Sequence, residues 1–159
     1  GEEPLLLMAC GSYQLAEMQR AAVRLRTAGL AYRLVYVQEP GRFRAPRDRW
    51  EAQALASPEV VAQLFAPALR RRVLLTHMRP EVARGHLWPL LPDASNTVVL
   101  GYRNRGGTLD EAGMQFANSA TWAHILDACA QLLQVPLSGV LSAAEMAAVK
   151  GEGDPRVLR

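Results

Sequence analysis

The run Leu5-Leu6-Leu7-Met8-Ala9-Cys10-Gly11-Ser12 decides the fold. Six consecutive apolar residues before a Gly-Ser turn are typical of a central strand that is buried on both faces, as in parallel sheets. We predict a helix over 13–28, with Ser12 as its N-cap and Gly29 as its end, because apolar residues recur there at helical spacing. These residues are Leu15, Met18, Ala22 and Leu25.

A second strand is predicted over 32–37, where the chain runs Tyr-Arg-Leu-Val-Tyr-Val. Strand, helix and strand within about 35 residues form a βαβ unit, which joins two parallel strands by a right-handed crossover. The first 37 residues therefore indicate an α/β protein with a parallel sheet.

The rest of the chain continues this alternation. We predict strands at 73–77 and 97–100, a short strand or edge segment at 114–117, helices from Pro58 (capped by Ser57) to Pro67 and at 80–91, 119–133 and 142–149, and an extended end at 151–155. With 159 residues the chain favours one domain. The expected architecture is a three-layer α/β/α sandwich around a mostly parallel sheet of about five strands.

Composition and charge exclude several classes of protein. Half of the residues are apolar, which favours a packed core over disorder. No apolar run approaches the roughly 20 residues that span a bilayer, and no signal segment is recognised, so we expect a cytoplasmic protein without a membrane partner. The net charge is only +3 and the basic residues are spread along the chain, so nucleic-acid binding is not expected. The start Gly1-Glu2-Glu3-Pro4 lacks an initiator methionine and suggests an excised piece of a longer protein.

Two clusters of arginine stand out in the sequence. The segment 39–50 contains Arg42, Arg44, Arg47 and Arg49. It is either an anion- or partner-binding loop or, the favoured interpretation, a solvated loop that Phe43 and Trp50 anchor to the body. Arg70-Arg71-Arg72, before the predicted strand 73–77, is interpreted as a solvated corner.

The sequence contains no recognisable catalytic set. Cys10 and Cys129 lie in apolar contexts and are predicted to be buried thiols that behave as small hydrophobes. His77 ends a predicted strand and His124 lies within a predicted helix, where structural roles are the favoured interpretation. No spacing typical of a metal site or of a Gly-x-Ser-x-Gly nucleophile is present, so a stand-alone acyl- or phosphotransfer enzyme is disfavoured.

The least generic stretch is Gly101-Tyr102-Arg103-Asn104-Arg105-Gly106-Gly107-Thr108, which follows the predicted strand 97–100. Its glycines do not have the Rossmann spacing, and it lacks the Lys-Ser/Thr ending of a phosphate-binding P-loop. Its arginines and backbone amides could nevertheless bind an anion at the carboxyl edge of the sheet.

From Gly101 to His124 the chain resembles, without a gap, the C-terminal domain of phosphoketolases. In that family the corresponding region looks like Gly-Tyr-Lys-Glu-Glu-Gly-Thr-Thr-Thr-Thr-Pro-Phe-Asp-Met. A helix with Asn-Asp-Leu-Asp-Arg-Phe-His follows it. The matching positions include Gly101, Tyr102, Gly106, Thr108, Met114, Asn118 and His124. His77 stands where the family has a strand ending Phe-His-Gly-Tyr, with Met78-Arg79 in place of Gly-Tyr, and 151–155 resembles a Gly-Glu-Asp-x-Pro ending.

The resemblance implies a transketolase C-terminal-like domain over 1–135 and a helical tail over 136–159. In such enzymes thiamine diphosphate and a divalent metal, Mg or Ca, bind between two upstream domains across a homodimer interface. The resemblance therefore implies that this domain holds neither cofactor and supplies no catalytic residue. The parent enzyme would be an aldehyde-lyase of carbohydrate metabolism that cleaves xylulose 5-phosphate or fructose 6-phosphate with phosphate and yields acetyl phosphate.

Two functions thus stay open at this point. The first is a non-catalytic, structural or regulatory C-terminal domain of a phosphoketolase-like enzyme. The second is a phosphate- or nucleotide-binding regulatory module that uses the loop Gly101–Thr108, with help from Arg42–Arg49 if the two segments converge. The candidate signature or anion-binding residues are Gly101, Tyr102, Arg103, Arg105, Gly106, Thr108, Asn118, His124 and His77.

Overall fold

A computed structural model of the chain describes residues 4–159 and contains, within that range, one four-stranded sheet. The strands are β1 (Leu5–Cys10), β2 (Tyr32–Tyr36), β3 (Arg72–Thr76) and β4 (Thr97–Leu100). Their order is β2-β1-β3-β4, and every neighbouring pair is parallel. The prediction of a parallel α/β sandwich is confirmed, with four strands in place of about five.

Strand β1 lies inside the sheet because both of its faces are apolar. All six of its residues are at most 1% exposed. Its side chains alternate between two cores, as the two-residue period of a strand requires. One core receives Leu5, Leu7 and Ala9, and the other receives Leu6, Met8 and Cys10.

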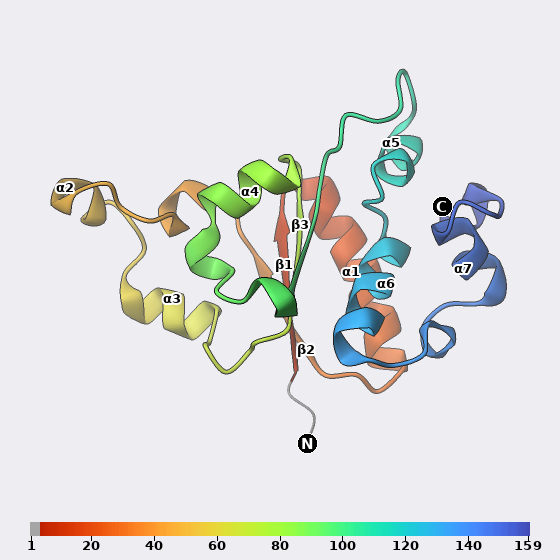
Figure 1. Cartoon of the computed structure of the whole chain (residues 1–159), viewed down its shortest axis with the longest axis horizontal. Coiled ribbons are helices and arrows are strands. Elements are labelled where there is room, and N and C mark those ends of the chain that lie inside the picture. The colour runs from red at the N-terminus through yellow and green to blue at the C-terminus, as the bar shows by residue number, and fades with distance from the viewer. Residues whose placement is uncertain (1–3) are drawn as a thin grey trace.

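Helices cover both faces of the sheet and complete the three layers (Figure 1). On one side lie α1 (Ser12–Thr27), α6 (Trp122–Leu133) and α7 (Ala143–Val149), and on the other lie α3 (Pro58–Leu64) and α4 (Pro80–His86). Two further helices, α2 (Arg49–Ala52) and α5 (Glu111–Ala117), stand beyond the carboxyl ends of β2 and β4. Single 3-10 turns occur at Pro40–Phe43, Trp88–Leu90, Ala94–Asn96, Leu137–Gly139 and Pro155–Leu158.

The predicted strand or edge segment at 114–117 is wrong, because these residues belong to α5. Asp110 is the N-cap of this helix, and its carboxylate accepts a hydrogen bond from the Gly113 amide at 2.8 Å. Glu111 adds a negative charge to the first turn, where the helix dipole favours it. The sequence contains this capping signal, but Met114 and Phe116 also fit the alternation of a short strand.

Four predicted boundaries also need correction, the first being that of the helix predicted over 119–133, which begins at Trp122. Helix α1 starts at Ser12, and its N-cap is Gly11, not Ser12. The helix predicted over 80–91 ends at His86 and is followed by a separate 3-10 turn. The end at 151–155 is not extended, because the chain turns into the 3-10 helix Pro155–Leu158.

Arg72 does not lie in the solvated corner that the sequence predicts, but inside the protein. It is 2% exposed. Its guanidinium group donates hydrogen bonds to four backbone carbonyl oxygens, and burial lowers its pKa. These carbonyls belong to Phe65, Ala66, Leu69 and Leu90, at distances of 2.7 to 3.2 Å. Arg72 therefore joins the end of α3 to the turn after α4.

The C-terminal segment packs against the face formed by α1 and α6. Ala148 and Leu158 are buried in the same core as those two helices. The indole Nε1 of Trp122 donates to the Leu158 carbonyl oxygen at 2.8 Å. Glu145 forms an ion pair of 2.6 Å with Arg24. The residues after 135 thus contribute to the core of the sandwich.

The two cysteines are free and buried, as predicted. Burial raises the pKa of both thiols, that of Cys129 to about 12, so both are protonated at neutral pH. Across residues 4–159, no helix combines the length and the apolar character that crossing a bilayer requires.

Candidate functional site

The candidate site lies at the carboxyl edge of the sheet, where the strand order reverses. β1 is followed in space by β2 on one side and by β3 on the other, so the crevice between the ends of β1 and β3 is a topological switch point. A cavity of about 210 Å³ occupies this place. It is lined by Tyr13, Gln14, Thr76, His77, Tyr102, Glu111, Met114, Gln115, Asn118 and Ala120.

Gly101 starts the loop after β4 at a point of close approach between two chain segments. The Tyr102 amide donates to the Met78 carbonyl oxygen at 3.0 Å, which ties this loop to the loop after β3. A Cβ atom at position 101 would collide with that same carbonyl and with Thr76. Only glycine therefore fits here, which gives this signature residue a steric role.

Asn118, seventeen positions after Gly101, holds the loop in shape. It is 3% exposed, and its Oδ1 accepts hydrogen bonds from the Arg103 amide at 2.8 Å and the Arg105 amide at 3.2 Å. Its Nδ2 donates to the carbonyl oxygens of Arg105 at 3.0 Å and Met114 at 2.9 Å. One buried side chain thus satisfies the backbone of a loop that has no partner strand.

The tip of the loop is exposed and turns through left-handed backbone conformations. Asn104 and Gly106 have φ angles of 58° and 111°. The Tyr102 hydroxyl donates to Asn104 Oδ1 at 2.9 Å, and Thr108 is exposed. These residues present a polar surface to solvent rather than a core.

The two candidate histidines occupy separate local environments. His77 is exposed, and its Nδ1 lies 3.0 Å from the Cys10 carbonyl oxygen. His124 is half-buried, with its Nδ1 2.8 Å from the Thr121 hydroxyl and its ring 5.9 Å from that of Phe116. Burial lowers the pKa of His124, Asp127 acts in the opposite direction, and Arg103 lowers it further.

The lowered pKa of His124 predicts a dependence of stability on pH. The unfolded histidine has a pKa near 6.5 and takes up a proton before the folded one does. We therefore expect the free energy of unfolding to hold its full value above about pH 6.5 and to fall as the pH decreases below it. Urea unfolding at pH 7.5 and about pH 5.5 measures this difference in the free energy of unfolding. In His124→Gln the difference between the two pH values should be smaller. A decrease that persists in His124→Gln but vanishes in the exposed control His77→Gln would contradict the assignment.

A second cavity, of about 350 Å³, lies at the ends of β3 and β4. It is lined by Arg79, Pro80, Glu81, Arg103 and Arg105. Arg103 and Arg105 were predicted as anion-binding residues, but Arg79 was not. It follows β3 by three positions, as Arg103 follows β4, and adjacent parallel strands end at the same edge of the sheet. That register is the signal in the sequence that could have identified it.

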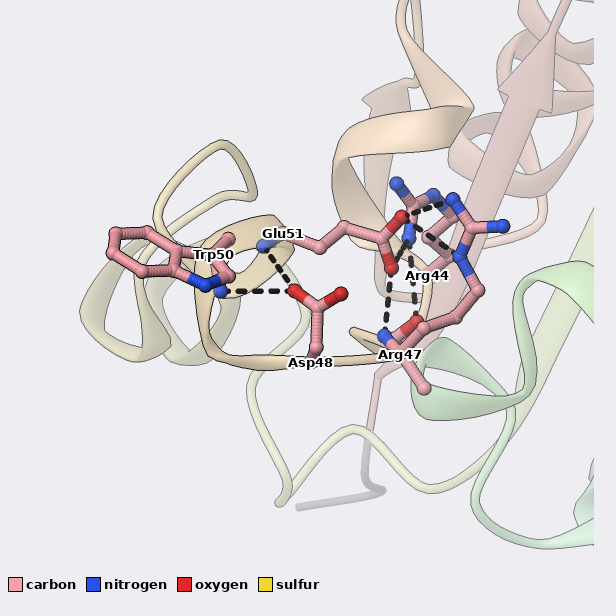
Figure 2. Close-up of polar contacts among 6 residues, drawn as sticks. Arg44, Arg47, Asp48, Trp50 and Glu51 are labelled. Atoms are coloured by element: carbon pink, nitrogen blue, oxygen red, sulfur yellow. Dashed lines mark hydrogen bonds and ion pairs between the residues drawn. The ribbon is translucent and has the colours of Figure 1, made fainter.

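The arginines of 39–50 are compensated within their own segment (Figure 2). Glu51 pairs with Arg44 at 2.5 Å and with Arg47 at 2.7 Å. Hydrogen bonds from Arg47 and Arg44 lower the pKa of Glu51 to about 2. The guanidinium of Arg49 lies 4.7 Å from the centre of the Trp50 ring. These local partners agree with the favoured interpretation of the segment as a solvated loop.

Two predictions about the segment 39–50 can be compared with the structure. They are its anchoring by Phe43 and Trp50, and its convergence with the loop Gly101–Thr108. Phe43 packs edge-on against Phe65, with ring centres 5.2 Å apart, and anchors the segment as predicted. Trp50 does not anchor it, because it is 67% exposed. In Figure 1, α2 stands at the far end of the long axis from the loop that leads into α5. Arg44 and Arg47 line a different cavity from the one that Arg103 and Arg105 line, so the two segments do not share a site.

Comparisons with known proteins do not assign this chain to a family. No protein-family model matches it, and no curated protein has significant sequence similarity to it. Between residues 4 and 159, no three His, Cys, Asp or Glu side chains come together to hold a metal ion. The class defined here is a three-layer α/β sandwich with a parallel sheet, two candidate pockets at its carboxyl edge and three arginines in one of them.

Proposed function

We propose that this chain is the C-terminal domain of a thiamine diphosphate-dependent phosphoketolase-like enzyme and that its role there is structural and regulatory. The parent enzyme would cleave xylulose 5-phosphate or fructose 6-phosphate with phosphate and release acetyl phosphate. Thiamine diphosphate and Mg or Ca would be held by upstream domains, in a homodimer. The layered α/β fold with a parallel sheet agrees with the architecture that the resemblance implies.

The observation that supports this proposal lies within the stretch 101–124, where two of the matching residues shape the same loop. Gly101 and Asn118, seventeen positions apart in the segment that resembles phosphoketolases, build one loop. Their roles are steric and hydrogen-bonding, because Gly101 allows a close approach and Asn118 satisfies the loop backbone. A signature made of such residues suits a domain that shapes an interface for catalytic partners rather than one that carries the reaction.

The test uses the product of the complete coding sequence. With fructose 6-phosphate or xylulose 5-phosphate, phosphate, thiamine diphosphate and Mg²⁺, we expect release of acetyl phosphate, measured as its hydroxamate. Omitting phosphate or thiamine diphosphate should abolish the signal. The 159-residue chain alone should neither release acetyl phosphate nor bind thiamine diphosphate in calorimetry. A complete product that lacks thiamine diphosphate-binding domains, or a chain that binds the cofactor tightly by itself, would overturn the proposal.

A second candidate function, a phosphate- or nucleotide-binding regulatory module, is favoured by a different observation. Arg103 and Arg105 reach the same cavity as Arg79. This function requires no catalytic group and is compatible with the first. Because the activity assay does not test ligand binding to this chain, a separate binding measurement is needed.

A further inference from the structure

We propose that Arg79, Arg103 and Arg105 form a binding site for the phosphate group of a small phosphate monoester. The proposal rests on the second candidate function and deepens it by adding Arg79 and naming the chemical class of the ligand. It concerns the carboxyl edge of β3 and β4, next to the switch-point cavity and separate from it.

The backbone brings these three arginines together from two loops. β3 and β4 pair in parallel, with Leu75 opposite Leu100, so the loops that follow them start side by side. The hydrogen bond from the Tyr102 amide to the Met78 carbonyl oxygen joins these loops one residue before each of the first two arginines. Asn118 then fixes the backbone at both Arg103 and Arg105 through their amides. The bases of the three side chains are therefore held in place although their ends are exposed.

This cavity keeps an excess of positive charge, with three arginines and one glutamate in its lining. In the part of the chain that the structure describes, the guanidinium groups of Arg79, Arg103 and Arg105 donate no hydrogen bond and form no ion pair. Glu81 lines the same cavity but lies beyond ion-pair distance of all three. By contrast, Arg44 and Arg47 are occupied by Glu51. The cavity keeps a net positive charge and unused donors.

A phosphate monoester matches these donors in charge, shape and size. It carries close to two negative charges at neutral pH and three acceptor oxygens, and planar guanidinium groups bind such oxygens in pairs. A cavity of about 350 Å³ is at the lower end of the range for small-molecule sites, so it suits a phosphate with one sugar ring. Because the arginines are exposed, binding should weaken as salt increases.

The site can be tested by titrating the isotopically labelled 159-residue chain and recording backbone amide spectra. The ligands are fructose 6-phosphate and AMP, with fructose and adenosine as controls and sodium chloride keeping the ionic strength constant. We expect saturable shifts centred on Arg79, Arg103 and Arg105 with both phosphates and none with the controls. The tighter of the two phosphates tells whether the organic part is a sugar or a nucleoside.

Variants separate this site from general attraction of anions. Arg79→Ala and Arg105→Ala should each weaken binding about tenfold, as expected for losing hydrogen bonds to a charged group. Arg71→Ala removes the same charge at the opposite end of β3 and should leave the affinity unchanged. No saturation up to about 10 mM ligand, or equal loss in Arg71→Ala, would overturn the proposal. Because only the 159-residue chain is used, the result is independent of whether the complete product releases acetyl phosphate.

Discussion

Replacing Arg72 with methionine is expected to lower the free energy of unfolding by about 3 kcal/mol. Methionine fills a similar volume, but it leaves four backbone carbonyl oxygens without the donor that they share. Each buried carbonyl that loses its hydrogen bond contributes a penalty on the order of 1 kcal/mol, partly relieved by water. Equilibrium unfolding in urea, followed by far-UV circular dichroism, measures the change.

Two further variants make the Arg72 result specific. Arg71→Met changes the same side chain one position earlier and should stay within about 0.5 kcal/mol of the wild type. Arg72→Lys keeps the charge but cannot reach all four carbonyls. Its loss of stability should therefore fall between those of Arg71→Met and Arg72→Met. Equal stability of Arg72→Met and Arg71→Met would show that the carbonyls after α3 and α4 find other partners.

Replacing Asn118 with alanine is expected to lower the free energy of unfolding by about 2 kcal/mol and to loosen the loop after β4. The variant loses four hydrogen bonds between the side chain and the backbone at once, and the loop has no adjacent strand to replace them. Amide hydrogen exchange at Arg103 and Arg105 should become faster by more than the global loss of stability explains.

The matched control for Asn118 is Asn104→Gly, because Asn104 lies in the same loop but is exposed, and glycine keeps its left-handed backbone. Among residues 4–159, the Asn104 side chain bonds to the Tyr102 hydroxyl alone. This variant should leave exchange at Arg103 and Arg105 near the wild-type rates. Slow exchange at both amides in Asn118→Ala would mean that the loop is held by other contacts, and the structural interpretation of the signature would fail.

The layered fold could be predicted because its main signals are local. The continuous apolar run of β1, the helical spacing in α1 and the capped start of α3 each fit within a few residues. The segment 114–117 was missed because its apolar residues contact the body as a short helix, and a four-residue pattern cannot separate a strand from a helix. Asp110, four positions before Met114, decides the structure here because it caps the helix that contains 114–117.

The contacts of the site could not be predicted, because they join residues far apart in sequence. Arg72 belongs to a basic triplet that resembles any solvated corner, and only the folded chain brings the carbonyls of Phe65 and Leu90 to it. Arg79 became a candidate only because the neighbouring strand β4 ends beside it and brings Arg103 to the same cavity. The signature residues Gly101 and Asn118 were identified from a resemblance, whereas their physical roles became visible only in three dimensions.

The inner position of β1 has a consequence for how the protein is made. Its two edges are filled by β2 and β3, so Leu7 pairs with Leu34 early in the chain but with Val73 only much later. Until residues 72–76 have emerged and folded back, an apolar strand without charge or proline keeps one edge open to other molecules. Pairings between such distant segments also form slowly. Nascent or refolding chains are therefore expected to self-associate at high concentration, and dilution or a chaperone that covers β1 should raise the yield of folded protein.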